Sequence, residues 1–326
     1  MVPSREFLES AAMCLYEQCE YPAVRYCILT KLLGKKAPEE LYRAFLYSDI
    51  VEELYQTQNA DGGWGPLESK DYTVKAKFPT SAVAISRCLY IGLGKDDRDI
   101  LFMAKEYLEG FLLGTAKEKI RPTNERVIPS RKALVCNLLE AIEPNNPLCD
   151  QTYYEWLYIA ERAFEGGEYS YERERAAQHE VFGTREDRLV PMQVSLLLKR
   201  RENIPPELEE AMLRHYGGHA NERGHFWDKT PGKLPDSFYY EKTRRWMYTF
   251  NYINMFRGSA LFLSGAVDWL ISNRSEDGLW DWGPQVKDPW GYFNYFSKNR
   301  KYKFNRKVDC TMEILSLIKQ YIDNNS

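Results

Sequence analysis

The stretch "QNADGGWG", Gln58 to Gly65, follows a long amphipathic segment, and a shorter echo, "RSEDGLWDWG", returns at Arg274 to Gly283. Each copy places an amide or guanidinium four residues before a glycine and six before a tryptophan: Gln58, Gly62 and Trp64, then Arg274, Gly278 and Trp280. A glycine lets the chain reverse tightly after a helix, and the polar side chain can satisfy backbone groups that a helix end leaves unpaired. The repeat therefore predicts one kind of turn between helices at two places in the chain.

Apolar residues recur at three- and four-residue steps through most of the chain, which is typical of amphipathic helices. This pattern predicts helices over 5–19, 22–34, 38–57, 79–93, 96–114, 129–142, 150–164, 188–200, 206–215, 243–272 and 308–322. Clusters such as "EPNNP" and "PGKLPD" mark the turns between them, and no long strand-like alternation occurs. We therefore expect an all-α fold of successive hairpins, in a single domain over 1–326 because no flexible linker divides the chain.

Composition narrows the class of protein. The chain has 326 residues and a net charge of -3, and its basic runs are local, so a nucleic-acid partner is not expected. No apolar window is long enough to span a membrane, and the N-terminus lacks the pattern of a secretory signal. The seven cysteines form no CxxC pair and fall mostly in helical stretches, which favours a reducing compartment and predicts a cytoplasmic protein. Aromatic residues make up 14%, a share that favours a cavity lined for an apolar ligand or a sugar.

The QxxxGxW pattern of the two turns resembles the QW repeat of the terpenoid-cyclase and protein-prenyltransferase superfamily. The segment "FPTSAVAISRCLYIGLG" after the first copy is similar to the helix that follows such a turn, and the resemblance covers residues 38–94 and 260–322. It implies an α/α toroid, a ring of helical hairpins like an (α/α)6 barrel. It also implies a central aromatic cavity that accepts an isoprenoid.

The stretch "KFNRKVDCTMEILSL", Lys303 to Leu317, carries the candidate chemistry. It resembles the DxDD-T element of class II cyclases, in which the central Asp protonates an alkene or epoxide. Asp309 matches that acid and Thr311 matches the Thr, while Lys307 and Cys310 replace the other two carboxylates. A strong acid in a dry cavity needs neighbours that hold its proton, so Asp309 beside a lysine is expected to be ionised. The resemblance makes Asp309 the candidate catalytic residue, with altered or lost chemistry.

The same stretch is similar to a second signature, basic-x-Asn-basic-x-Val-Asp-x-Cys of prenyltransferase β subunits, which it matches at Lys303, Asn305, Arg306, Val308 and Asp309. In that family the two cations hold an isoprenoid diphosphate, which implies this role for Lys303 and Arg306. The thiolate ligand of zinc does not match, because Cys310 comes one residue early and a helix turns about 100° per residue. We expect no zinc or magnesium cofactor. From the residues alone, Lys303, Arg306 and Lys307 can equally be solvated charges at a helix start or partners of nearby acids.

Aromatic side chains crowd the segment before this stretch. Four of them are candidates for the lining of the cavity: Trp282, Trp290, Tyr292 and Tyr295. A second cluster, between residues 215 and 245, contains His215 and His219 at the i, i+4 spacing of a metal pair. Gly217 and Gly218 lie between them and are expected to break the helix, so we expect a loop rather than a metal site.

Three functions stay open. The first is an isoprenoid-binding protein, enzymatic or not, of the kind that the resemblance implies. The second is a carbohydrate-active helical barrel, whose carboxylates would come from the acidic cluster Glu222, Asp228, Asp236 and Glu241. The third is a binding or scaffold module without catalysis. The sequence does not fix stoichiometry, and either a partner subunit or a homodimer is compatible with it.

Overall fold

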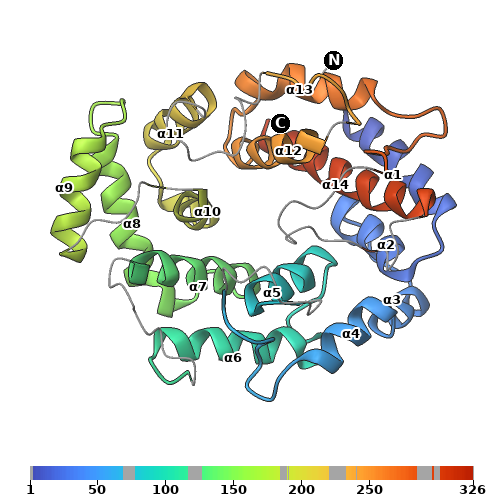
Figure 1. The fold of residues 1–326 in the computed structure, drawn as a ribbon, viewed down its shortest axis with the longest axis horizontal. Coiled ribbons are helices and arrows are strands. Elements are labelled where there is room, and N and C mark those ends of the chain that lie inside the picture. Colours follow the sequence, from blue (N-terminus) through green and yellow to red (C-terminus); the bar gives the residue numbers. More distant parts are fainter. Residues whose placement is uncertain are drawn as a thin grey trace. The chain divides into compact units, whose positions relative to one another are not determined.

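The structure is a computed structural model that describes residues 3–68, 78–116, 127–183, 189, 191–219, 233–239, 241–284, 296 and 302–325. Within these ranges the regular elements are helices and no strand occurs, which confirms the predicted all-α class (Figure 1). Contacts within the chain group it into two compact units, and the single domain over 1–326 stays a prediction. Unit 1 combines Met1–Glu52 with Leu213–Ser326, and unit 2 is Glu53–Met212.

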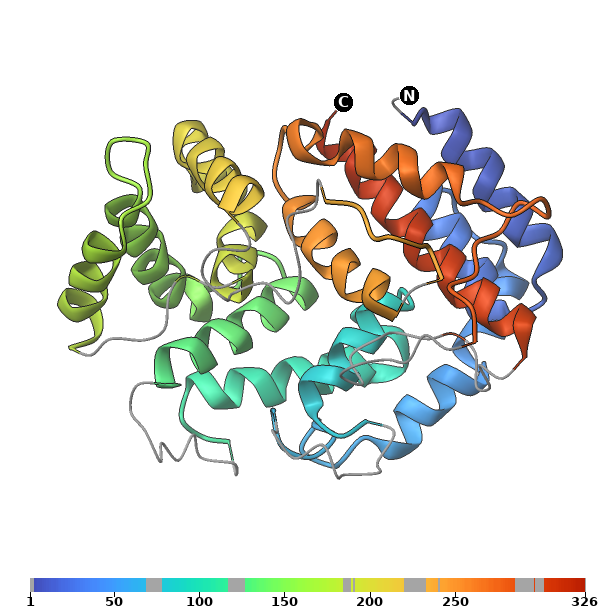
Figure 2. The same cartoon turned by 45° about the horizontal axis from the view of Figure 1, so that its top comes forward.

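Unit 1 brings the two ends of the chain together. Its elements are α1 (Arg5–Gln18), α2 (Pro22–Cys27), the π-helix η1 (Ile28–Leu32), α3 (Glu39–Leu46), α12 (Glu241–Ile253), α13 (Ala260–Ser272) and α14 (Lys303–Asn324). The helices α4 (Asp49–Thr57) and α11 (Pro206–His219) cross the unit boundaries. The first helix lies beside the last, blue against red in Figure 2. The 22-residue α14 buries a long apolar face from Val308 to Ile322, which makes it the core helix of this unit.

Unit 2 consists of successive helices. They are α5 (Ser81–Tyr90), η2 (Asp97–Asp99), α6 (Ile100–Leu112), α7 (Ile128–Ile142), η4 (Pro147–Cys149), α8 (Asp150–Ala163), α9 (Tyr171–Phe182), α10 (Pro191–Lys199) and η5 (Arg201–Asn203). The closest packing joins α7 to α10 and α8 to α9 (Figure 1). Ser170 begins α9 as its N-cap, because its hydroxyl accepts the Arg173 amide at 3.3 Å.

Two predicted helices are each divided in the structure. The segment 38–57 forms α3 and α4, which separate at Tyr47 and Ser48, where the Ser48 hydroxyl donates to the Phe45 carbonyl at 2.6 Å. The segment 243–272 forms α12 and α13, with residues 254–259 between them. The Asn254 side-chain amide donates to the Leu317 carbonyl of α14 at 2.8 Å, and the Asn324 side chain donates to the Asn254 carbonyl at 2.6 Å, so tertiary contacts occupy the polar groups of Asn254 where α12 ends. Helix α9 falls in the stretch 165–187, for which the sequence predicted no element.

The predicted helix break between His215 and His219 was wrong. Helix α11 runs through Gly217 and Gly218 to His219. A Cβ added at Gly217 would lie 2.5 Å from a ring carbon of Phe262 in α13, so the missing side chain permits close packing of two helices. Packing therefore outweighs the cost of about 1 kcal/mol that a glycine adds to a helix.

Candidate functional site

The first tryptophan turn connects α4 to the chain that leads to α5. The Gln58 amide donates to the Gly62 carbonyl at 2.8 Å and to the Ile100 carbonyl at 2.9 Å. The Trp64 indole N–H donates to the Leu54 carbonyl in the last turn of α4, at 2.9 Å. Trp64 is only 5% exposed, so it belongs to the core of the turn.

The second turn, after α13, repeats these contacts. The Arg274 Nε donates to the Gly278 carbonyl at 2.6 Å, and the Trp280 indole donates to the Leu270 carbonyl at 2.7 Å. Trp280 is fully buried. The sequence predicted that the amide or guanidinium would satisfy the helix end, but the indole does so in both copies, and the Gln or Arg side chain holds the turn itself.

Glycine is required in both turns. Gly62 has φ +88 and Gly278 has φ +81, values that side chains rarely adopt. A Cβ at Gly62 would lie 2.1 Å from the Met103 carbonyl oxygen, and one at Gly278 would lie 2.5 Å from the Cys14 sulfur. The chain therefore closes against a neighbouring element at each glycine.

A hydroxyl from the following helix completes each turn. The Trp64 amide donates to the Ser81 hydroxyl at 2.9 Å, and the Trp280 amide donates to the Thr311 hydroxyl at 3.0 Å. The two helices, α5 and α14, also bury residues at the same spacing. In α5 the buried positions include Ser81, Ala84, Ile85 and Cys88. The corresponding buried positions in α14 are Thr311, Ile314, Leu315 and Ile318. Each joint is therefore a helix, a tryptophan turn and a second helix with a hydroxyl at a fixed place.

The predicted cations lie on the first turn and a half of α14. Lys303 is exposed. The Arg306 guanidinium lies 3.4 Å from the Asp281 carboxylate and is largely buried, with 11% of its side chain exposed. Lys307 forms an ion pair with Asp277, the aspartate of the second turn. Partnership with acids, one of the two alternatives for these cations, thus applies to Arg306 and Lys307.

The pairing perturbs Asp277. Burial raises the pKa of its carboxyl, but the hydrogen bonds from Lys307 and from the Leu279 amide, with the charges of Lys307 and Lys303, outweigh it, so the pKa lies below its ordinary value. Gln18 of α1 donates to the Asp277 backbone carbonyl at 3.1 Å. This contact fixes the turn against the first helix.

Asp309 is buried, with 2% of its surface exposed. Its Oδ1 accepts the backbone amide of Phe296 at 2.8 Å. The negative charge of this carboxylate affects the nearby phenol of Tyr21. Burial raises the pKa of the phenol, and Cys19 and Asp309 raise it further. The same phenol donates to the Asn305 side chain at 2.8 Å. A buried carboxylate, a guanidinium and a phenol therefore gather around the start of α14.

The two joints differ in charge. Counted from the tryptophan, Asp281 stands where the first copy has Gly65, and counted from the hydroxyl, Asp309 stands where it has Pro79. The first joint forms without either acid. The buried charges of the second joint thus exceed what this kind of turn needs.

Other predicted site residues are less informative. Trp282 is buried, with 2% exposed, whereas Trp290, Tyr292 and Tyr295 lie outside the described residues. Of the acidic cluster considered for carbohydrate chemistry, Asp236 is exposed. Glu222, Asp228 and the side chain of Glu241 lie outside the described residues.

Sequence reasoning missed Asp277, Asp281 and Tyr21. Asp277 and Asp281 lie within the second tryptophan turn. Their position in the repeat could have pointed to them, but only with the knowledge that this turn contacts α14. Tyr21 lies 284 positions from Asn305, and no pattern connects them.

Comparisons with known proteins add no family. The chain matches no protein-family model, and no curated protein or solved structure matches it. In the described part of the chain, no three His, Cys, Asp or Glu side chains gather where they could hold a metal ion. No helix among the described residues has the length and apolar character that crossing a membrane requires.

Proposed function

We propose that the chain binds an isoprenoid, as a diphosphate, beside the start of α14, in the manner of the superfamily that its tryptophan turns resemble. In this proposal the hairpins form an α/α toroid, and the cavity takes the apolar chain of the ligand. Lys303 and Arg306 hold the diphosphate, and Asp309 acts as a fixed negative charge rather than as a proton donor.

The observation that carries the proposal is the difference between the joints. Asp281, Arg306 and Asp309 are buried or nearly so, and the matching joint in unit 2 forms without the two acids. Burying a charge in a low-dielectric environment costs free energy unless the charge is paired. Because the first joint forms without these acids, the turn itself does not explain why the second joint buries them. A diphosphate bound by the exposed Lys303 and the buried Arg306 gives these cations a use, and Asp281 then holds the Arg306 guanidinium in place.

Oδ1 of Asp309 accepts the Phe296 amide, which supports binding without protonation. An acid that protonates an alkene must be held neutral, and an amide donor favours the charged form of a carboxylate instead. We therefore expect bound isoprenoid to be released unchanged.

A thermal-shift series tests the proposal, with farnesyl diphosphate, geranylgeranyl diphosphate, farnesol, inorganic diphosphate and an oligosaccharide. A ligand at 100 times its Kd adds about 2.7 kcal/mol, which raises the melting temperature of a chain of 326 residues by about 4 °C. We expect the prenyl diphosphates to give this shift and inorganic diphosphate or farnesol alone to give less.

Variants locate the site. Lys303→Ala should weaken prenyl diphosphate binding about tenfold, because one contact to a charged group is worth about 1.5–3 kcal/mol. Lys319→Ala removes a cation four turns further along α14 and should leave binding unchanged. No shift with any isoprenoid, or equal effects of the two variants, contradicts the proposal. Chromatography of the extracted ligand should show no new product.

A scaffold without a ligand is the second candidate, because Arg306 and Lys307 already have acidic partners. It predicts no shift with any member of the series. A shift with the oligosaccharide alone favours the carbohydrate alternative.

A further inference from the structure

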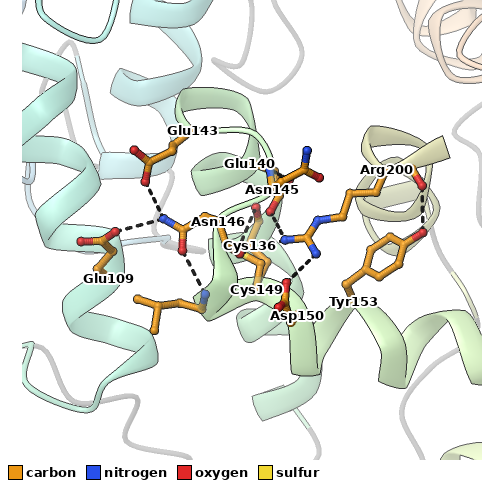
Figure 3. Close-up of polar contacts among 11 residues, drawn as sticks. Glu109, Cys136, Glu140, Glu143, Asn145, Asn146, Cys149, Asp150, Tyr153 and Arg200 are labelled. Carbon is orange, nitrogen blue, oxygen red and sulfur yellow. Dashed lines mark hydrogen bonds and ion pairs between the residues drawn. The ribbon is translucent and has the colours of Figure 1, made fainter. Parts of the chain in front are cut away.

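Two buried cysteines of unit 2 lie against each other. Cys136 is in α7, and Cys149 ends the short helix η4 that leads into α8. Both are 0% exposed, and the structure contains them as free thiols. The Cys149 thiol donates to the Cys136 carbonyl oxygen at 3.9 Å, and the two thiol side chains lie close enough to affect each other (Figure 3).

An arginine stands beside this pair. The Arg200 guanidinium, 4% exposed, contacts Glu140 at 2.5 Å, Asp150 at 2.6 Å and the Asn146 carbonyl at 2.8 Å (Figure 3). The negative charge of Glu140 raises the pKa of both cysteines, and the positive charge of Arg200 offsets part of that rise. A thiolate, not a thiol, is the nucleophile in sulfur chemistry.

The contact between the two thiol side chains shifts their pKa values in opposite directions. It lowers the pKa of Cys136, against the effect of burial. The same contact raises the pKa of Cys149, and burial adds to the rise. By contrast, burial raises the pKa of Cys27 to about 12 and raises that of Cys88 as well. Cys136 is therefore the thiol of the pair suited to act as nucleophile.

We propose that Cys136 and Cys149 are a redox-active pair that a peroxide converts to an intramolecular disulfide. The Cys136 thiolate attacks a peroxide oxygen, the O–O bond breaks, and a sulfenic acid forms while hydroxide leaves and takes the proton of Cys149. The Cys149 thiolate then attacks the Cys136 sulfur, the S–S bond forms, and the S–O bond breaks. The second hydroxide takes up the proton that Cys136 lost, so two thiols and hydrogen peroxide give one disulfide and two waters.

Access to the pair comes through the turn that carries Cys149. Asn145 and Pro147 of this turn are exposed, so the buried thiols lie directly beneath a surface segment. Local opening of such a segment needs less free energy than global unfolding. The disulfide would tie α7 to the start of α8 across this turn, which also carries Asn146, a partner of Arg200.

Mass spectrometry tests the proposal on the full chain. Trypsin cleaves after Lys132 and Arg162 and leaves both cysteines in one peptide, 133–162. Native protein is treated with hydrogen peroxide or buffer, denatured in N-ethylmaleimide and digested. We expect the untreated peptide to carry two maleimide groups. The peroxide-treated peptide should carry none and weigh two hydrogens less than the free dithiol.

Cys27 and Cys88 are the matched controls, because they are equally buried and lie in other peptides. They should stay labelled at a peroxide dose that converts the 133–162 peptide. Cys149→Ser should prevent the two-hydrogen loss, and reduction of the oxidised wild-type protein should restore both labels. Unchanged double labelling after peroxide, conversion no faster than the oxidation of Cys88, or cross-linking between chains would overturn the proposal.

Discussion

Replacing Glu140 by alanine tests the buried ion network most directly. Its side chain is 1% exposed and contacts the Arg200 guanidinium at 2.5 Å. Its second oxygen accepts the amide of Asn145 at 2.9 Å, where the backbone has a positive φ of 61. The substitution leaves a buried guanidinium with two partners, Asp150 and the Asn146 carbonyl, and leaves one amide without its acceptor.

The expected loss follows from these contacts. Removing one partner of a buried ion pair costs about 3–5 kcal/mol, and the low end applies here because Asp150 still contacts Arg200. The lost amide contact adds about 1 kcal/mol. We expect Glu140→Ala to lower the free energy of unfolding by about 4 kcal/mol. Glu140→Gln, which retains an acceptor but not the charge, should lower it by about 2 kcal/mol.

Urea unfolding followed by circular dichroism measures the effect. With a slope of about 3 kcal/mol per M, the loss moves the midpoint down by more than about 1 M. Glu165→Ala is the control, because the pair Arg162–Glu165 is 48% and 58% exposed and such pairs contribute less than about 1 kcal/mol. If Glu140→Ala and Glu165→Ala lower stability equally, desolvation cancels the attraction in the buried pair and the reasoning fails.

Two further predictions concern a turn and a surface acid. Gly62→Ala should lower the free energy of unfolding by about 2–5 kcal/mol, because Gly62 has a positive φ and lies against Met103. Gly34→Ala should lower it by about 1–2 kcal/mol, because Gly34 has φ +63 but open space around it. Equal losses of the two variants in urea unfolding would contradict this reasoning. The hydrogen bond from Lys95 lowers the pKa of Glu143, so its carboxylate stabilises the folded state above the ordinary value of 4.5, and this contribution is lost as pH falls below it. The stability difference between wild type and Glu143→Gln should therefore shrink between about pH 5 and 3, and a difference independent of pH would refute the role of the charge.

Periodicity alone was enough for the fold class, because the described helices bury faces spaced at three and four residues. It failed where tertiary contacts decide. Asn254 ends α12 by bonding to α14, and Gly217 keeps α11 intact by packing against Phe262. Neither contact has a local signal in the sequence.

The candidate site was predictable only on one side. Lys303, Arg306 and Asp309 share one short stretch, so a family signature could point to them. Their partners come from the second turn and from the residue that precedes α2, and a local pattern cannot indicate that Asp281 meets Arg306 or that Tyr21 lies near Asp309. Whether a cation of the site is available to a ligand depends on these distant partners, so the sequence alone could not predict it.

Comparing the two joints shows which residues of the cyclase-like stretch in α14 the turn itself requires. Thr311 matches the threonine of the cyclase element, yet its hydroxyl accepts the Trp280 amide, as the Ser81 hydroxyl accepts that of Trp64. A residue that both joints need is explained by the turn, so the match at Thr311 bears on fold. Asp309 has Pro79 at the corresponding place, and the first joint closes without an acid there. The inference of a ligand near α14 therefore depends on Asp309 and its neighbouring cations.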